Sequence, residues 1–499
     1  MLKKDHFHLR VFVRFFPWIC LILWILLQIP FLTADPDTLV DLNTRGAWTD
    51  EGLYSGTARI FLNTGTIDPY ENSLYTRGPL FTWLQIPVFF LFGQSLLTAR
   101  LMVLAMVVFA LILLMRRQET RTAGLFLLAA GFTQFHLFQF SHYAMAEMMG
   151  TAVILMAILC IVNLEINPSD HRNQLRWILL ASGLLFIVYA LKIQFLYIAF
   201  LLPGYYLLRM LPVLFSNSEE GIRRRRQFFL AMLLTAAWMV FYGVAWYLPN
   251  RAFYDYVMAR EVDGRFPDTI DSILNSARFN FTVLLWVPYL KPLIVAGAAA
   301  LAGGLVRLLW KPASWSPVHK ALFLLGLVWF LGELHKIPMT YMPHRYLVSA
   351  YTALGLMIAS FAASVATDRK WLGGIMAMLM VCMAAVQLPH TIEAIGRRTY
   401  DLRAVNRYIR QYPWEGKTIT GAWGPSAAWG TKARVFPVWY GFVNDDRAMD
   451  ARMVIAESDQ EDSDRSLMMQ GIDIYTAADS SRRFPIWRYQ VDFYWIPEK

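Results

Sequence analysis

The sequence predicts a polytopic α-helical membrane protein with a small water-soluble α/β domain at its C-terminal end. Three observations support this fold class. The 499 residues are 57% hydrophobic and only 16% charged, which is too apolar for a soluble domain with a single core. Apolar residues gather in long runs, and basic residues fall in the short loops between them. After residue 389 the apolar runs shorten and charged residues become frequent.

The apolar runs have the length of membrane-spanning helices. A bilayer core requires about 20 apolar residues per helix. Eleven stretches are candidates: 11–33, 96–115, 122–140, 144–164, 175–191, 193–211, 227–248, 282–308, 320–337, 345–365 and 371–389. The first is long, aromatic and without a small-residue cleavage site, so we expect an uncleaved helix rather than a signal peptide. The shorter stretch 79–92 is expected to be interfacial or re-entrant.

Basic residues predict the orientation of these helices. If every stretch spans, the short basic loops all fall on one side, which is then the cytoplasmic side. These loops carry Arg116, Arg117 and Arg121; Arg172 and Arg176; Arg223 to Arg226; Arg307, Lys311 and Lys320; and Arg369 and Lys370. The outer side then receives loop 34–95, loop 249–281 and everything after residue 389.

The chain therefore divides into a membrane domain, 1–389, and an extracytoplasmic α/β domain, 390–499. In the second unit, spacing and composition predict helices at 400–412 and 462–470 and strands at 417–422, 452–456 and 490–495. No internal repeat stands out in the sequence, which argues against a transporter built from duplicated halves.

Composition also argues against several functional classes. The net charge of +10 arises from loops beside apolar runs, so we expect membrane lipids and no nucleic acid as partners. Cys20, Cys160 and Cys382 each lie inside an apolar run without a CxxC motif or nearby His, which predicts neither a disulfide nor a thiolate metal site. The sequence contains no nucleotide-binding motif.

An acidic pair opens the first outer loop. Asp50 and Glu51, in Trp48-Thr49-Asp50-Glu51-Gly52-Leu53-Tyr54, begin an amphipathic helix that ends near Gly65. Such residues can be simple helix caps, which contribute about 0.5–2 kcal/mol. They can also act as a general base, because deprotonating a hydroxyl requires a carboxylate within hydrogen-bond reach. The sequence leaves both roles open, and paired carboxylates would also suit Mg²⁺ or Mn²⁺.

Other polar residues are predicted on the same side. Glu147 lies about one turn into the fourth span, where an acid marks function unless it snorkels to the interface. Lys192, between the fifth and sixth spans, could hold a phosphate or snorkel. Arg77 and His142 alone indicate only polar groups at the interface. The outer turn after the ninth span carries Glu333, His335, Lys336, His344 and Arg345, and an anionic ligand would explain its positive charge.

Several of these segments resemble the GT-C superfamily of membrane glycosyltransferases, closest to the protein O-mannosyltransferase and lipid A aminoarabinose transferase branch. The similar segments are 49–54, Ala58-Arg59, Gly65, 77–83, 91–93 and 99–101, with Glu147 and 343–347 further along. In that branch an acidic pair opens a helix, a Lys-Pro-Pro-Leu-like segment precedes an aromatic run, and a late Arg-Tyr-Leu segment follows. This sequence departs from the pattern at Arg77-Gly78, at Glu147, where Asp is usual, and at Lys192-Ile193.

The resemblance implies a GT-C-like fold and transfer of a sugar from a polyprenyl-phosphate-linked donor to a protein, lipid or glycan acceptor. It further implies inversion at the anomeric carbon and no required metal or other cofactor. The expected location is the bacterial inner membrane. The implied catalytic residues are Asp50, as base, with Glu51 and Glu147. Arg77, Lys192 and Arg345 would bind the donor phosphate, and Tyr54, His142, His344 and Tyr346 would position the acceptor or sugar.

Two other functions fit part of the sequence. A transporter or flippase of a lipid-linked or charged solute would also bury Glu147 and Lys192, but it would not need a long outer loop that begins with two carboxylates. A non-catalytic scaffold with the GT-C fold is the third interpretation, and the departures at positions 78 and 147 favour it.

Overall fold

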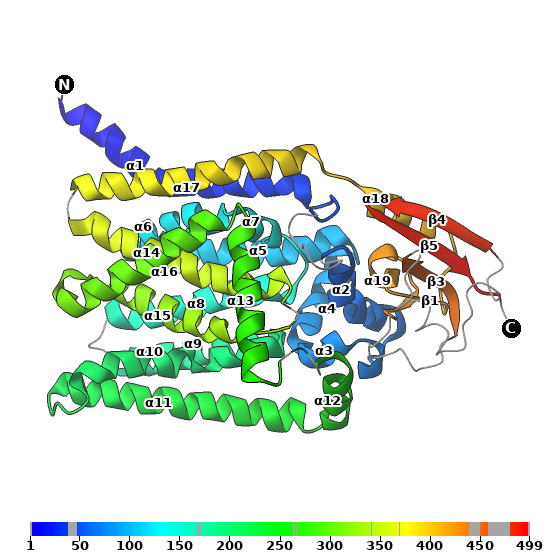
Figure 1. Cartoon of the computed structure of the whole chain (residues 1–499), viewed down its shortest axis with the longest axis horizontal. Helices are drawn as coiled ribbons and strands as arrows, with labels where there is room; N and C mark the ends of the chain where they lie inside the picture. The colour runs from blue at the N-terminus through cyan, green and yellow to red at the C-terminus, as the bar shows by residue number, and fades with distance from the viewer. Residues whose placement is uncertain are drawn as a thin grey trace.

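The computed structural model shows a bundle of long helices with a small β-sheet at one end (Figure 1). It describes residues 2–37, 47–166, 171–262, 265, 267–340, 342–368, 370–438, 450–457 and 480–497. The predicted helix at 462–470 lies outside the described residues. The predicted fold class, a helical membrane protein with a small C-terminal α/β unit, is confirmed.

The bundle consists of helices built mainly from apolar residues. These are α1 (Leu2–Gln28), α5 (Leu96–Arg116), α6 (Gln118–Leu127), α7 (Phe135–Phe140), α8 (Ala146–Ile166), α9 (His171–Leu191), α10 (Leu201–Met210), α11 (Glu219–Tyr242), α14 (Lys291–Trp310), α15 (Pro317–Glu333), α16 (Val348–Asp368) and α17 (Lys370–Gly396). Helices α8 and α16 form the centre of the bundle, because most of their side chains are buried by neighbouring helices.

Nine helical segments of the described residues are long and apolar enough to cross a membrane. They overlap the predicted stretches except 11–33 and 122–140. The first of these corresponds to a shorter apolar helix, Phe15–Phe31, and the second is divided between α6, a π-helical turn at Leu128–Phe132 and α7. The count of eleven spans therefore stays a prediction.

One predicted span has the wrong start. The stretch expected at 282–308 is two helices, because α13 (Ile270–Trp286) ends before Val287 and α14 begins at Lys291. Pro288 and Pro292 explain the break, since proline donates no backbone hydrogen bond and is tolerated only in the first turn of a helix. Figure 1 shows α13 running across the direction of the bundle helices.

Short helices lie between the bundle and the sheet (Figure 1). They are α2 (Ala47–Thr64), α3 (Ser73–Arg77), α4 (Pro79–Phe92) and α12 (Arg251–Val257). The acidic pair lies in the first turns of α2, as the sequence predicted. Two 3₁₀ segments complete this layer, namely η4 (Ile193–Phe200), which follows α9, and η10 (His344–Leu347), which precedes α16.

In its described residues, the C-terminal unit has a five-stranded sheet and two helices. Its elements are α18 (Asp401–Ile409), β1 (Thr418–Thr420), α19 (Gly424–Ala427), β2 (Arg434–Phe436), β3 (Ala451–Glu457), β4 (Ser480–Ile486) and β5 (Tyr489–Trp495). The strand order is β2-β1-β3-β5-β4, with β1 parallel to both neighbours and the β3–β5 and β5–β4 pairs antiparallel. The predicted helix at 400–412 and all three predicted strands overlap observed elements, whereas β2 and β4 were not predicted.

Helix α2 joins the sheet unit to the bundle. Trp48 packs in the core of the C-terminal unit, where its ring stacks on Trp487 at 6.4 Å. The Ser426 hydroxyl donates a 3.0 Å hydrogen bond to the carbonyl of Thr49, and Arg59 donates a 2.6 Å bond to the carbonyl of Pro425. Helix α17 runs to Gly396, past the predicted domain boundary at residue 389. The start of α2, where the acidic pair lies, is therefore held in place by the C-terminal unit.

Candidate active site

The two acidic residues of α2 point to different partners, because successive side chains on a helix are about 100° apart. Asp50 faces Arg345, whose Nε lies 3.1 Å from Asp50 Oδ2. Glu51 faces Arg100. Burial raises the pKa of Asp50 above the usual range for aspartate, and the charge of Arg345 opposes that shift only in part. Asp50 therefore has the environment of a proton acceptor with increased basicity.

Glu147 and Lys192 form a buried ion pair beside Asp50. Lys192 Nζ lies 2.5 Å from Glu147 Oε1, and the Tyr54 hydroxyl donates a 3.0 Å hydrogen bond to the same oxygen. Lys192 also donates to the Tyr54 hydroxyl. Arg345 Nε lies 4.0 Å from Glu147 Oε1. Among the described residues, no group hydrogen-bonds to the buried Oε2 of Glu147.

Each of these side chains is placed by the end of a helix. Asp50 and Tyr54 lie one turn apart on α2, and Glu147 lies in the first turn of α8. Lys192 occupies the junction where α9 ends and η4 begins, and Arg345 lies in η10. Elements that are far apart in sequence thus meet at the sheet-side end of the bundle, which was predicted to be the outer side.

Tyr346 lies among several cations. Lys192 Nζ is 5.0 Å from the centre of the Tyr346 ring, and Arg265 Nη1 is 3.1 Å from its hydroxyl. Arg77 also lies within electrostatic range of Tyr346. Arg265 was missed from the sequence, because a single basic residue in a polar loop carries no signal that it will contact a distant tyrosine. The concentration of positive charge makes this region suitable for an anion.

Arg77 has its own acidic partner. Its Nη2 lies 2.7 Å from Glu261 Oε2 and donates a 2.8 Å hydrogen bond to the Ser73 hydroxyl. Ser73 in turn donates a 3.0 Å hydrogen bond to Glu261. Arg77 therefore lies at the edge of the cluster, next to loop 249–281. The contacts described for Arg77 do not include Asp50 or Glu147.

Glu51 belongs to a separate, buried hydrogen-bond network. Arg100 donates to both carboxylate oxygens of Glu51, at 2.8 and 2.5 Å, and to the carbonyls of Phe31 and Ala34, each at 2.6 Å. The backbone amide of Ala144 donates a 2.7 Å hydrogen bond to Glu51. These hydrogen bonds connect α2 to α5 and to the segment before α8. Glu51 therefore holds in place the elements that carry Asp50 and Glu147.

Among the described residues, the contacts of the two predicted histidines, His142 and His344, do not include Asp50 or Glu147. His142 Nδ1 is 2.7 Å from Gln28 Oε1, and its ring stacks on Phe31 at 5.6 Å. The buried ring nitrogens of His344 have no hydrogen-bond partner among the described residues, and its ring meets that of His136 edge to face at 5.6 Å. These contacts place both rings among packed aromatic side chains.

Side-chain cations, rather than further acidic groups, lie closest to the carboxylates of the cluster. Mg²⁺ and Mn²⁺ prefer about six oxygen ligands, and no group of three or more His, Cys, Asp or Glu side chains with the arrangement of a metal site occurs among the described residues. Asp50 and Glu147 instead face the cations Arg345 and Lys192. Positive charge at this position is thus supplied by side chains.

Comparisons with known proteins support the fold. No family model matches the sequence, and no curated protein matches it. The structure is similar to ArnT from Cupriavidus metallidurans bound to undecaprenyl phosphate, with a TM-score of 0.57, 14% identity and coverage of 97% of this chain and 98% of that one. ArnT in the apo state gives a TM-score of 0.54 and 16% identity over 95% and 97% of the two chains.

A second solved protein has a similar arrangement. The oligosaccharyltransferase of Archaeoglobus fulgidus, in complex with Zn and sulfate, gives a TM-score of 0.55 at 14% identity over 88% of this chain and 68% of that one. Identities this low establish the fold alone. The chain therefore shares the fold of ArnT and of this oligosaccharyltransferase, in agreement with the fold that the sequence resemblance implied.

Proposed function

We propose that this protein is a membrane glycosyltransferase that moves a sugar from a polyprenyl-phosphate-linked donor to an acceptor at the outer face of the bacterial inner membrane. The observation that carries the proposal is the cluster of Asp50, Glu147, Lys192 and Arg345, where buried carboxylates and cations meet at one end of the bundle. The shared fold supports it, because ArnT was solved with undecaprenyl phosphate, a lipid of the proposed donor class.

The donor phosphate would lie between the cations around Tyr346. Lys192, Arg345 and Arg265 approach this residue from three separate elements, and guanidinium groups can bind phosphate oxygens through two parallel hydrogen bonds. As the bond between the anomeric carbon and the phosphate oxygen breaks, negative charge accumulates on the phosphate. Fixed cations in a buried site stabilise that charge more strongly than water does.

Asp50 would act as the general base. As the acceptor attacks the anomeric carbon, its proton moves to the Asp50 carboxylate, and the polyprenyl phosphate leaves from the opposite face. A single displacement of this kind inverts the configuration of that carbon. The raised pKa of Asp50 makes it a stronger base than a solvent-exposed aspartate, which favours proton transfer.

Glu147, Glu51 and Tyr54 would position these groups. Glu147 and Tyr54 hold the Lys192 ammonium, and the free Oε2 of Glu147 is available to a sugar or acceptor hydroxyl. Glu51, through Arg100, would fix the start of α2 and the segment before α8. Arg77 would act on the phosphate at longer range. The role of His142 and His344 in positioning the acceptor or sugar stays a prediction.

The proposal is tested by reconstituting the full chain in proteoliposomes with radiolabelled polyprenyl-phosphate sugars and an extract of cell-envelope acceptors. Mass spectrometry of envelope glycans from cells with and without the protein identifies which sugar and acceptor to use. We expect release of free polyprenyl phosphate and labelling of the acceptor. Movement of the intact donor across the bilayer without release would instead identify a flippase, and neither event would identify a non-catalytic scaffold.

A further inference from the structure

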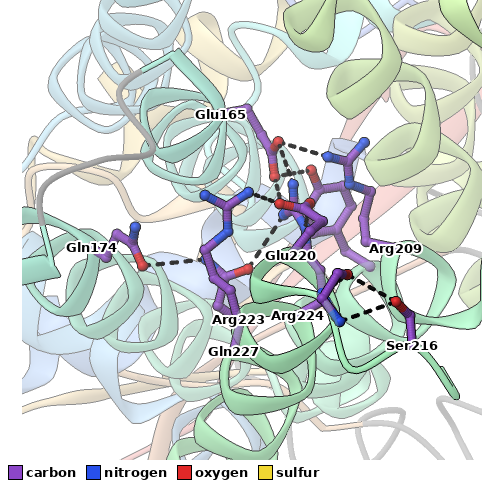
Figure 2. A network of polar contacts seen from close by, with 11 residues as sticks. Glu165, Gln174, Arg209, Ser216, Glu220, Arg223, Arg224 and Gln227 are labelled. Carbon is purple, nitrogen blue, oxygen red and sulfur yellow. Dashed lines mark hydrogen bonds and ion pairs between the residues drawn. The ribbon is translucent and has the colours of Figure 1, made fainter. Parts of the chain in front are cut away.

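A second buried charged cluster lies at the opposite end of α8 from Glu147. Glu165, in the last turn of α8, meets Arg209 at the end of α10 and Arg224 near the start of α11 (Figure 2). Figure 1 shows the turn between α10 and α11 at the end of the bundle away from the sheet. The sequence predicted this side to be cytoplasmic, because Arg223 to Arg226 form one of its basic loops.

The Glu165 carboxylate is saturated by hydrogen bonds. Its Oε1 accepts from Arg224 Nη1 at 2.7 Å and from the Tyr205 hydroxyl at 2.9 Å. Its Oε2 accepts from Arg209 Nη2 at 2.9 Å and from Arg224 Nη2 at 3.2 Å. Arg224 also pairs with Glu220 through its Nε, at 2.7 Å. Glu165 therefore has no capacity left to neutralise other cations.

Positive charge exceeds negative charge in this cluster. Arg223 shares the Glu220 carboxylate with Arg224. Lys320, on α15, lies within electrostatic range of Arg209, Arg224 and Glu165 but forms no ion pair with any described residue. The described side chains thus bring four cations, Arg209, Arg223, Arg224 and Lys320, to the two carboxylates of Glu165 and Glu220.

Two buried polar atoms beside these cations lack partners. Within the described part of the chain, neither the hydroxyl of Tyr206 nor the Nε of Arg209 has a hydrogen-bond partner. The Tyr206 side chain is fully buried and lies within electrostatic range of Glu165, Arg209 and Arg224. A buried donor without a partner is destabilising.

Apolar side chains project from the same turn. Phe215 is 94% exposed and Leu211 is 53% exposed. The turn is held in place by Arg225, whose Nη1 donates to the carbonyls of Leu214 at 2.7 Å and Ser216 at 2.9 Å. Exposed apolar groups beside surplus cations match a phospholipid, in which acyl chains adjoin a charged headgroup. A free phosphate has no apolar part that could pack against the exposed Phe215.

We infer that the turn between α10 and α11, together with Lys320 of α15, binds the phosphate headgroup of an anionic phospholipid. The phosphate contacts Arg209, Arg223 and Lys320, and the acyl chains of the lipid pack against Phe215 and Leu211. The bound lipid offsets part of the local excess of positive charge. It thereby ties α10, α11 and α15 together at the end of the bundle remote from the proposed reaction centre.

The test uses the full chain in detergent and measures by native mass spectrometry how much phosphatidylglycerol or phosphatidylcholine it retains. We expect the wild type to retain phosphatidylglycerol preferentially. The variant Arg223→Gln/Lys320→Gln should lose that preference by about fivefold for each charge removed. Both positions lie outside the saturated Glu165 pairs, so the fold should survive. The matched control, Lys432→Gln/Arg488→Gln, removes two cations from the C-terminal unit and should bind like the wild type.

A second variant separates lipid from free phosphate. Phe215→Ser should weaken retention of phosphatidylglycerol and leave any binding of inorganic phosphate unchanged. Equal retention of the two lipids by the wild type would overturn the inference, as would unchanged retention in the double variant. Unchanged retention in Phe215→Ser, or displacement of phosphatidylglycerol by millimolar inorganic phosphate, would show that the site takes free phosphate and would also overturn it.

Discussion

A buried glutamate lies near each end of α8, and the two differ in how many of their carboxylate oxygens accept hydrogen bonds. Glu165 accepts hydrogen bonds on both carboxylate oxygens, from Tyr205, Arg209 and Arg224. Glu147 receives the bonds of Tyr54 and Lys192 on Oε1 alone, and its buried Oε2 has no hydrogen-bond partner among the described residues. A saturated carboxylate stabilises a fold, whereas unused hydrogen-bonding capacity in a buried group is the feature expected of a ligand site.

The two ends also differ in what surrounds the ion pairs. The Glu147 end adds a second carboxylate, Asp50, and several cations that approach Tyr346 from different elements. The Glu165 end adds only cations, beside exposed apolar side chains. The first combination suits acid–base chemistry on a phosphorylated substrate, and the second suits a lipid headgroup. The predictions below test this division.

Replacement of Asp50 should have the largest effect on catalysis. Asp50→Asn keeps the size of the side chain but removes the proposed base, so we expect turnover to fall by about 10²–10⁴-fold. The rate of polyprenyl phosphate release measures this, and Asp255→Asn, at an exposed position, is the matched control. Turnover near the wild-type value would show that Asp50 is only a helix cap.

Replacement of Arg345 should weaken binding of the donor phosphate. Arg345→Gln removes one charge-assisted contact, and we expect the Kd for polyprenyl phosphate to rise by about tenfold to 100-fold. Isothermal titration or tryptophan quenching in nanodiscs measures the affinity, with Arg278→Gln on the exposed face of α13 as control. An unchanged Kd, with the fold intact, would remove Arg345 from the phosphate site.

Replacement of Glu165 should affect stability and spare the chemistry. Glu165→Gln leaves Arg209 without its carboxylate partner and Arg224 with Glu220 alone, and breaking a buried pair in this way costs about 3–5 kcal/mol. Thermal unfolding should show the loss, while turnover per folded molecule stays near the wild-type value. The contrast between Glu165 and Glu147 would be contradicted if Glu165→Gln lost turnover without losing stability.

The pH dependence should show the smallest effect. A general base is active when deprotonated, and burial raises the pKa of Asp50, so activity should fall at a higher pH than expected for an ordinary aspartate as the solution is acidified. The charge of Arg345 lowers that pKa, so Arg345→Gln should move the acidic limb of the kcat/KM profile to still higher pH. If the acidic limb lay at the same pH in both proteins, the group that titrates there would not be Asp50.

Hydropathy and basic loops were sufficient to predict the fold class. Asp50, Glu147, Lys192 and Arg345 were predicted on one side because each adjoins the outer end of an apolar stretch, and the structure brings them together. The start of α14 was predicted wrongly because the residues on both sides of Pro288 and Pro292 are apolar, so the two helices read as one apolar stretch. Arg265 was missed because its contact with Tyr346 depends on how an irregular loop folds back.

Sequence adjacency was also misleading in one respect. Asp50 and Glu51 suggested one paired site, yet the helical twist directs Glu51 to Arg100 and away from Arg345. The excess of cations around Glu165 was interpreted only as a topology signal, because charge pairing across α8, α10 and α11 depends on how the helices pack. Such pairings become visible only once the helices are assembled (Figure 2).

The most direct test of the proposed reaction centre is a cryo-electron microscopy structure of the full chain in nanodiscs with polyprenyl phosphate. We predict density for the phosphate at the Glu147 end of α8, within hydrogen-bond distance of Lys192, Arg345 or Arg265, with Asp50 on the side open to the acceptor. Polyprenyl phosphate bound only at the Glu165 end, or no bound phosphate beside Tyr346 at saturating concentration, would contradict the account.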